Sequence, residues 1–295
     1  MRTVVFLNPH SRRAANSLAA VQEFFAGHKK FDVVDFIVAK DLKHFDTYIA
    51  RLRRHKNIDC VIVGSGDGTI VAVLNALKNR KNLVYGFLPL GTTNVFARNL
   101  GLPLGFKKSL QVVASQHSRG INLGSVNGVL FVNTADIGLT VQVVKRLHNR
   151  LKRYLGPLAY YLVSFRVLVH AKPIRCELQI GKEVTNIQTY NLAAFNGRYY
   201  GTVVANKDGS VYNDTFTVLY GTDVSRFGFF RDVHSFALGR QYKSRSVRMI
   251  SAPQLTLRTE QPQDIQADGE VVSTTPAEIK IVKDAIRVLV PEKRS

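Results

Sequence analysis

Apolar runs and amphipathic segments alternate along the first third of the chain. Four runs read as buried strands, and three of them are followed by apolar positions at helical spacing. The strands are expected at 3–8, 31–39, 59–64 and 83–90, and the helices at 14–25, 45–54 and 69–78. A strand followed by a helix, repeated along the chain, predicts a parallel sheet with helices on its faces, extending to about residue 116.

From about residue 122 the pattern changes to short β-rich runs separated by glycines and Asn/Asp clusters. The runs lie at 128–136, 174–180, 185–196, 216–221, 246–252, 254–259 and 277–282. They predict an antiparallel β domain interrupted by one helical stretch around 140–170. We therefore expect two domains, 1–121 and 122–283, with the tail at about 284–295 free to return to the first. The cleft between two such domains is the default place for a ligand.

The chain is strongly basic, with 41 Lys and Arg residues against 21 Asp and Glu residues and a net charge of +20. Nucleic acid, an anionic membrane and a polyphosphate ligand would all be attracted, so charge alone does not rank these partners. No apolar run approaches the length of a transmembrane helix. Two cysteines without metal-like spacing favour a reducing compartment, so we expect a cytoplasmic protein.

Glycines and polar side chains cluster where the third predicted strand ends, in the sequence GSGDGT at 64–69. Ligands of parallel sheets bind beyond the carboxyl ends of strands, where glycines let the main chain approach a phosphate. Asp67 can hold a metal or polarise a bound group, and Thr69 can cap the following helix. The alternative is an ordinary strand-to-helix turn with an aspartate cap.

Two further loops of this kind follow neighbouring strands. PLGTTN at 89–94 comes after the fourth strand, and LNPHS at 7–11 closes the first. Because the strands are parallel, we expect all three loops at one sheet edge, where they form a phosphate-binding site. Arg98, on the helix after PLGTTN, either contacts a phosphate or is an ordinary exposed arginine.

Four motifs, in this order along the chain, resemble those of one known family: LNPHS, GSGDGT, PLGTTN with FARNLGLP at 96–103, and ADGE at 267–270. Together they are similar to the diacylglycerol kinase family of soluble bacterial lipid kinases, which includes the sphingosine kinases. NAD kinases share the fold and the GGDGT-type loop. FARNLGLP and the aromatic segment YLGPLAYYL at 154–162 favour the lipid branch.

The resemblance implies a three-layer α/β domain that binds ATP, a C-terminal β-sandwich-like domain, and an active site in the cleft between them. It implies nucleotide binding by Asn8, Pro9, His10, Ser11, Arg12, Ser65, Gly66, Asp67, Gly68, Thr69, Thr92 and Asn94. Glu270 matches the family's proton acceptor, and we assign Asp268 and Asp67 as carboxylates that organise Mg²⁺, the phosphates or the base. Read alone, ADGE is a hairpin turn, a role compatible with catalysis.

The resemblance also implies a structural Mg²⁺ in the second domain, held by Ser210, Asn213 and Thr215. Asn213 stands where the family typically has aspartate, so this metal site lacks one expected carboxylate. Other departures are Ser65 for the first glycine of GGDGT, as in sphingosine kinases, Arg12 for a glycine, and Ala72 for a glutamate. They leave phosphoryl-transfer chemistry intact and bear on the choice of substrate.

Basic residues concentrate in two segments of the second domain. The stretch around 140–170 carries no acidic residue and alternates cations with leucines and tyrosines. It is expected to dock reversibly on an anionic membrane, the alternative being a helix packed on the β domain. The run at 226–248 places four phenylalanines among arginines, either lining a lipid entrance or forming core and rim.

The leading hypothesis is an ATP-dependent lipid kinase acting on diacylglycerol or a related long-chain alcohol, associated peripherally with the inner face of the membrane. One alternative is an NAD kinase-like phosphotransferase with a soluble substrate. Another is a non-catalytic basic membrane- or nucleic-acid-binding protein on a kinase scaffold. We do not expect nucleic acid as a partner, because no RRM, KH or helix-turn-helix pattern is present. Homodimer formation is left open.

Overall fold

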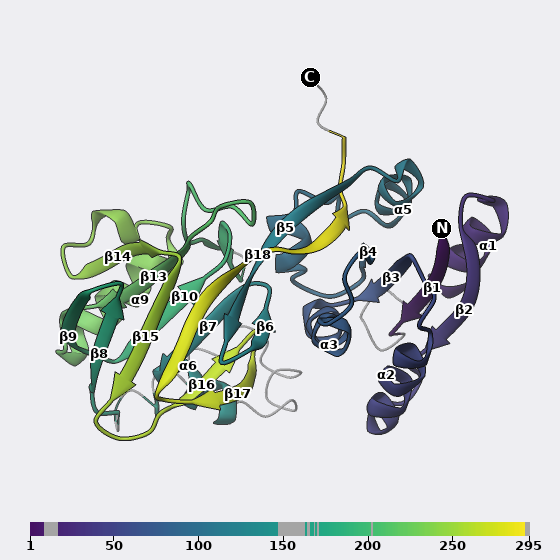
Figure 1. The fold of residues 1–295 in the computed structure, drawn as a ribbon. Coiled ribbons are helices and arrows are strands. Elements are labelled where there is room, and N and C mark those ends of the chain that lie inside the picture. The colour runs from purple at the N-terminus through teal and green to yellow at the C-terminus, as the bar shows by residue number, and fades with distance from the viewer. Residues whose placement is uncertain are drawn as a thin grey trace. The chain divides into compact units, whose positions relative to one another are not determined.

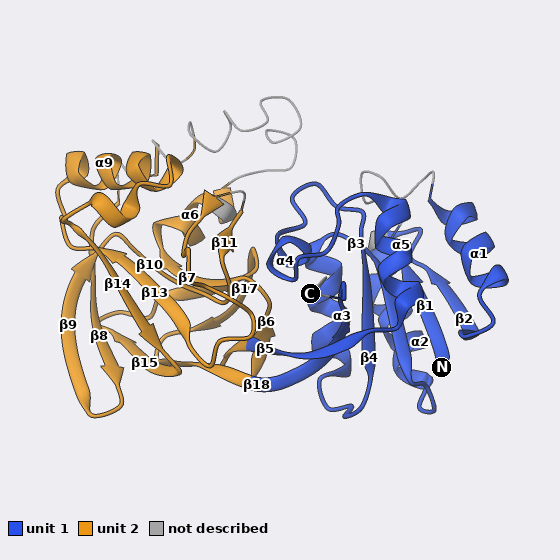
Figure 2. Ribbon diagram, turned by 90° about the horizontal axis from the view of Figure 1, so that it is seen from above, with its two compact units in different colours: residues 1–123, 283–295 blue, residues 124–282 orange. Residues whose placement is uncertain are grey.

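A computed structural model of the 295-residue chain describes residues 1–8, 17–146, 163, 166–167, 169, 171–201 and 203–292. It divides into two compact units, shown in different colours in Figure 2. Unit 1 comprises residues 1–123 and 283–295, and unit 2 comprises residues 124–282. The chain therefore leaves unit 1 once and returns to it at the C-terminal end.

Unit 1 contains a parallel sheet in the order β2, β1, β3, β4 (Figure 1). Its strands are β1 (Arg2–Leu7), β2 (Asp32–Val38), β3 (Cys60–Ser65) and β4 (Val84–Pro89). Its helices are η1 (Leu42–His44), α1 (Leu18–Gly27), α2 (Phe45–Arg54), α3 (Asp67–Leu77), α4 (Val95–Asn99) and α5 (Phe106–Ser115). The strands β5 (Ser118–Val126) and β18 (Ala277–Leu289) each have residues in both units.

The sheet of unit 1 is covered by helices on both faces, because its strands are apolar on both sides. On one face, Leu7 packs in a single buried cluster with Phe25 of α1 and Val113 of α5. On the other face, the rings of Phe6 and Phe45, at the start of α2, lie 6.0 Å apart. The predicted three-layer α/β architecture is confirmed.

Unit 2 is built from antiparallel strands in two sheets. One has the order β14, β13, β10, β7, β16, β17, and the other contains β18, β15, β8 and β9, with β6 paired to β5. The bounds are β6 (Val129–Phe131), β7 (Thr134–Gly138), β8 (Ile174–Ile180), β9 (Glu183–Thr189), β10 (Asn191–Phe195), β11 (Tyr199–Tyr200), β12 (Val203–Val204), β13 (Phe216–Gly221), β14 (Val247–Ala252), β15 (Gln254–Thr259), β16 (Asp264–Ala267) and β17 (Glu270–Thr274). β11 and β12 form a separate two-stranded ribbon.

The two sheets of unit 2 enclose one core. Ile137 and Val218 from the first sheet and Leu178 and Leu257 from the second belong to the same buried cluster. The segment predicted as one β run at 185–196 forms two strands, β9 in one sheet and β10 in the other, on either side of Tyr190. Face-to-face packing of antiparallel sheets is a β-sandwich, as predicted.

Three helices are described in unit 2: α6 (Leu139–Arg146), α9 (Arg226–Ala237) and the short η2 (Gln241–Lys243). The expectation of a single helical stretch was wrong, because α9 is a second α-helix. Its pattern is unusual, since Gly228 and Asp232 are its buried residues while Phe227 and Phe230 are exposed. A helix with a polar buried face lacks the apolar periodicity that sequence analysis relies on.

Candidate functional site

The GSGDGT and PLGTTN loops lie against each other at the carboxyl ends of β3 and β4. Ser65 pairs with Pro89 in the ladder, and the Leu90 N–H donates to the Ser65 carbonyl at 3.1 Å. A Cβ added to Gly91 would lie 2.6 Å from the Cα of Gly66, which is closer than packing allows. The main chains of the two loops therefore touch, and the contact requires glycine.

Asp67 ties the two loops together. Its carboxylate accepts hydrogen bonds from the backbone N–H groups of Val95, at 2.9 Å, and Phe96, at 3.1 Å. These are the first residues of α4, so the side chain joins the start of α3 to the start of α4. Burial raises the pKa of Asp67, and the two N–H donors partly offset that effect. Its carboxylate positions the loops and has lone pairs left for a metal ion or its water.

The end of β1 lies beside the same loops. Asn8 is buried; its N–H donates to the Gly64 carbonyl at 3.0 Å, and its side-chain amide donates to the Thr69 hydroxyl at 3.0 Å. The start of the first loop is thus fixed to the start of α3. Pro9, His10, Ser11 and Arg12, which the family resemblance also assigns to the nucleotide, lie outside the described residues.

The PLGTTN loop is held in shape by Asn94, which has a left-handed backbone conformation with φ of 47°. Its side-chain oxygen accepts from the Gly91 N–H, and its amide nitrogen donates to the carbonyls of Gly91 and Pro89. Asn94 is therefore buried in its own loop, whereas Thr92 is exposed on it. The Arg98 side chain is exposed and donates to the Thr93 carbonyl at 3.1 Å.

The described part of this sheet edge fits an anionic phosphate chain. Gly68, in the first turn of α3, is exposed, and a Cβ added to it would meet no atom within 4 Å. The first N–H groups of a helix have no partner within the helix and favour anions. Glycines at 66, 68 and 91 thus leave the main chain accessible where those donors lie.

The ADGE motif forms the tight turn between β16 and β17. Asp268 and Gly269 both have positive φ, 49° and 94°, and Ala267 pairs with Glu270 across the hairpin. This is the two-residue turn that Asp-Gly sequences favour. Glu270 is exposed at the start of β17, where its carboxylate can reach a ligand from solvent.

The Asp268 carboxylate organises the neighbouring loop of unit 2. It accepts hydrogen bonds from the backbone N–H groups of Val132 at 2.7 Å, Asn133 at 2.9 Å and Thr134 at 3.1 Å. The Asp268 N–H in turn donates to the Thr134 carbonyl at 2.9 Å. Asp268 therefore fixes the turn from which Glu270 projects.

Asp136 on β7 is a buried carboxyl that the sequence analysis did not identify. It is 1% exposed and accepts from Thr134, Gln266 and Tyr200 at 3.2 to 3.4 Å. Burial raises the pKa of Asp136 to about 7, and the nearby charge of Asp268 raises it further. The signal available in the sequence was an acid between Ala135 and Ile137 within an apolar run.

The residues assigned to a structural Mg²⁺ lie in the loop before β13. The Ser210 hydroxyl accepts from the Tyr212 N–H at 3.2 Å, and the Asn213 amide donates to the Asp208 carbonyl at 2.9 Å. Ser210, Asn213 and Thr215 offer only neutral oxygens, whereas Mg²⁺ is usually bound through at least one carboxylate. Among the residues described, no group of three or more His, Cys, Asp or Glu side chains could hold a metal. The structural Mg²⁺ remains a prediction.

An apolar cavity of about 200 Å³ lies in unit 2, between the outer face of the β10 and β13 sheet and helix α9. Ala193, Phe195 and Leu219 line it from the strands, and Phe229 and Phe236 line it from the helix. The Tyr190 and Phe229 rings lie 5.3 Å apart in an edge-on contact at its wall. The cavity suits a narrow hydrocarbon chain.

The basic stretch around 140–170 falls largely outside the described residues, including 147–162. Of its apolar residues, Val163 and Val167 are buried in a cluster with Leu139, Val143 and Tyr190. This part of the stretch packs on unit 2, in agreement with the alternative of a helix packed on the β domain. No described helix is long and apolar enough to cross a bilayer.

Both units match families of known proteins. Residues 2–126 match the diacylglycerol kinase catalytic domain, and residues 135–290 match the YegS C-terminal NAD kinase beta sandwich-like domain. The diacylglycerol kinase of Bacillus subtilis is 28% identical over 254 residues, covering 84% of this chain and 83% of that protein. The diacylglycerol kinase of Staphylococcus saprophyticus is 25% identical, covering 80% and 78%.

Solved structures agree with this fold. A putative diacylglycerol kinase of Bacillus anthracis superposes with a TM-score of 0.82 at 20% identity, covering 98% of this chain and 95% of that one. An NAD kinase of Archaeoglobus fulgidus in complex with ATP gives 0.59 at 14% identity, covering 99% and 95%. An α/β unit joined to a β-sandwich unit defines the NAD kinase-like class of fold. Within this class, the chain belongs to the diacylglycerol kinase family.

Proposed function

We propose that the protein is an ATP-dependent lipid kinase that transfers the γ-phosphate of ATP to the hydroxyl of diacylglycerol or a related long-chain alcohol. Membership of the diacylglycerol kinase family gives the reaction class. The observation that carries the choice of a lipid is the apolar cavity beneath α9. A soluble dinucleotide would need convergent polar groups, whereas most of the surface that lines this cavity is apolar, and its aspartates, Asp223 and Asp232, are paired with Arg231.

Unit 1 supplies the nucleotide-binding part of the proposal. The touching glycine loops and the exposed first turn of α3 offer backbone N–H groups to the triphosphate. The Asp67 carboxylate holds the two loops together through the N–H groups of Val95 and Phe96. Asp67 is also the first residue of α3, directly before the exposed Gly68. ATP use is also consistent with the NAD kinase of similar fold that was solved with ATP. Bound Mg²⁺ would neutralise charge on the phosphates.

Unit 2 supplies the proton acceptor. In the proposed step the lipid hydroxyl oxygen attacks the γ-phosphorus, the bond from that phosphorus to the β–γ bridging oxygen breaks, and ADP leaves. Glu270 takes the hydroxyl proton. Asp268 is a positioning residue, because its three backbone hydrogen bonds fix the turn from which Glu270 projects. The protein is proposed to work in the cytoplasm, bound reversibly to the anionic inner face of the membrane.

The test is to incubate the purified protein with Mg²⁺ and ATP labelled in the γ-phosphate, and to offer diacylglycerols, other long-chain alcohols and NAD. Label is expected in a phosphorylated lipid. Label found only in NADP would establish the NAD kinase-like alternative, and label in no acceptor would establish a non-catalytic scaffold. Either result would overturn the lipid kinase.

A cavity-filling variant tests the role of the apolar cavity. Ala193→Leu places three additional carbon atoms in a cavity of about 200 Å³, and it is expected to raise the KM for long-chain diacylglycerol while ATP affinity is kept. Ala50→Leu makes the same change at an exposed position of α2 and serves as the matched control. Unchanged lipid kinetics in a folded Ala193→Leu protein would show that the acyl chain binds elsewhere.

A further inference from the structure

Helix α9 exposes large apolar side chains on its outer side, although it buries an aspartate on its inner side. Gly228 and Asp232 are buried, whereas Phe227 is 79% exposed and Leu238, the C-cap residue, is 52% exposed. Leaving such side chains in water forgoes the stabilisation that burial of their apolar surface would give. A helix that exposes its large apolar residues presents them to something other than water.

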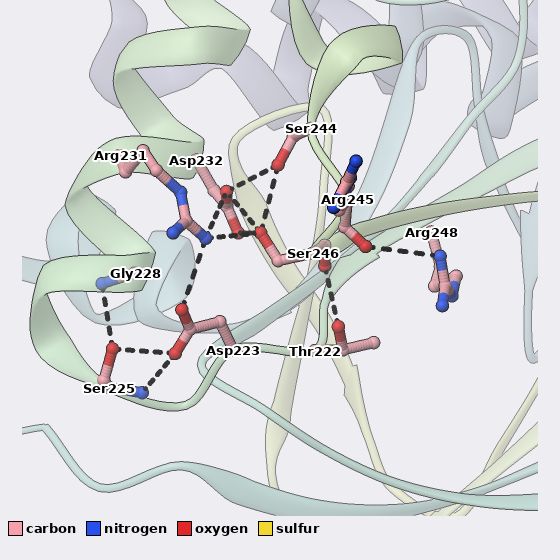
Figure 3. A network of polar contacts seen from close by, with 10 residues as sticks. All are labelled: Thr222, Asp223, Ser225, Gly228, Arg231, Asp232, Ser244, Arg245, Ser246 and Arg248. Carbon is pink, nitrogen blue, oxygen red and sulfur yellow. Dashed lines mark hydrogen bonds and ion pairs between the residues drawn. The ribbon is translucent and has the colours of Figure 1, made fainter.

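A polar network holds the inner side of α9 in place (Figure 3). Asp232 accepts hydrogen bonds from the hydroxyls of Ser244, at 2.9 Å, and Ser246, at 2.7 Å, and pairs with Arg231 at 3.4 Å. Arg231 also pairs with Asp223 at 3.2 Å. The aspartate is thus paired and hydrogen-bonded, and the network fixes which face of α9 points outward.

The segment that contains this exposed apolar face is rich in cations. Residues 222–248 contain six Arg or Lys residues and two Asp residues, a net charge of +4, and both aspartates pair with Arg231. Arg240, Lys243 and Arg245 line a cavity of about 710 Å³ together with the Arg231–Asp223 ion pair and with serine and threonine residues. Among the described residues none of these three cations has an acidic partner within ion-pair distance.

The opposite side of the same helix lines the proposed acyl cavity. Phe229 and Phe236 face it from α9, and Phe236 also packs against Tyr200, with ring centroids 5.6 Å apart. A surface that receives a lipid from a bilayer needs apolar side chains at the headgroup boundary and cations for the phosphates. The outer face of α9 and the following turn have both, directly beside the cavity.

We propose that a docking surface formed by Phe227, Leu238, Arg240, Lys243 and Arg245 binds an anionic phospholipid bilayer. Phe227 and Leu238 enter the headgroup boundary, and the three cations bind lipid phosphates. The proposal deepens the proposed lipid kinase function by naming where the enzyme meets the membrane. The unpaired positive charge favours an anionic bilayer over a second copy of this equally basic chain.

Vesicle co-sedimentation of the full-length chain, without ATP, tests the docking surface. Wild-type protein is expected to bind vesicles of phosphatidylcholine mixed with phosphatidylglycerol, to bind phosphatidylcholine alone weakly, and to dissociate as salt rises. Removing three cations that each contribute about fivefold should weaken binding about a hundredfold. The charge variant combines Arg240→Gln, Lys243→Gln and Arg245→Gln. Its control, with the same change in net charge on exposed residues of unit 1, combines Lys29→Gln, Lys30→Gln and Lys107→Gln.

The apolar part is tested by combining Phe227→Ser with Leu238→Ser, and Val184→Ser, 54% exposed on β9, serves as the control. The double variant is expected to lose about tenfold or more in vesicle affinity. Circular dichroism verifies that it folds. Vesicle affinity equal to wild type in both docking variants would overturn the proposal. A wild-type dimer that becomes monomeric in the double variant, with vesicle binding unchanged, would assign the face to a second copy.

A kinase assay separates docking from catalysis. On short-chain diacylglycerol in detergent micelles both docking variants are expected to retain wild-type turnover, and on vesicle-embedded diacylglycerol they are expected to lose it. Vesicle binding is measured without turnover, so a protein that binds as predicted but phosphorylates no lipid would refute only the kinase. A protein that phosphorylates micellar lipid but binds vesicles independently of the docking surface would refute only the docking proposal.

Discussion

Replacing Asp136 by Asn tests whether the buried carboxyl of unit 2 is protonated in the folded protein. Its pKa is raised from an ordinary value of 3.8 to about 7 because the group is buried. A difference of about three pH units corresponds to about 4 kcal/mol, at 1.36 kcal/mol per unit. The side chain is 1% exposed, so solvent screens little of this effect.

Burial favours the neutral form of Asp136 in the folded state, so this residue makes the protein less stable as pH rises. The stabilisation from Asp136 is complete below pH 3.8, is lost progressively as pH rises, and is absent above about pH 7. Asparagine has no proton to lose, so Asp136→Asn removes this dependence. Its amide group can donate a hydrogen bond to the side-chain oxygen of Gln266, which is buried without a partner.

Urea unfolding, followed by far-ultraviolet circular dichroism at several pH values, measures the effect. From about pH 5 to about pH 7.5, wild type should lose about 3 kcal/mol more unfolding free energy than Asp136→Asn. Other titrating groups cancel in this difference. Asp46→Asn, at an exposed site on α2, should parallel wild type. Parallel pH profiles for wild type and Asp136→Asn would refute a protonated buried carboxyl.

Three further substitutions address the loops and the hairpin. Gly91→Ala should lower ATP affinity at least about tenfold, since its Cβ would lie 2.6 Å from the Gly66 Cα; calorimetry measures this, and Gly105→Ala, at an open position, should bind normally. Asp268→Ala should cost about 2–3 kcal/mol of unfolding free energy, because three N–H groups lose their acceptor; an unchanged urea midpoint would contradict this. Glu270→Gln should abolish turnover with ATP affinity kept, and near-normal turnover would remove Glu270 from the base role.

The α/β unit was largely predictable because two physical signals agree there. Strands buried on both faces give continuous apolar runs, and the bounds of α2 match the predicted helix at 45–54. The glycine loops were also visible in the sequence, because a main-chain contact such as Gly66 with Gly91 excludes other residues. The structure adds that the loops touch, which spacing alone does not specify.

The direction of polar side chains was not predictable in the same way. Asn94 and Asp67 were assigned to the nucleotide, but Asn94 bonds its own loop and Asp67 bonds the first residues of α4. A motif records that a polar group is required and leaves open whether a ligand or the backbone requires it. Asp136 is isolated in an apolar strand, and α9 buries an aspartate while exposing Phe227 and Phe230, so neither has the pattern that hydrophobic periodicity detects.

The return of the C-terminal segment to unit 1 affects how the chain is made. Val288 of β18 pairs with Tyr85 of β4, and Leu289 lies in the core with Val5 and Leu7. Synthesis proceeds from the N-terminus, so unit 1 lacks its fifth parallel strand until residues 283–289 have left the ribosome. A nascent or truncated chain that ends before residue 283 would leave the edge of β4 without its partner strand. Such an unpaired edge is a template for aggregation, although β4 is far from the missing segment along the sequence.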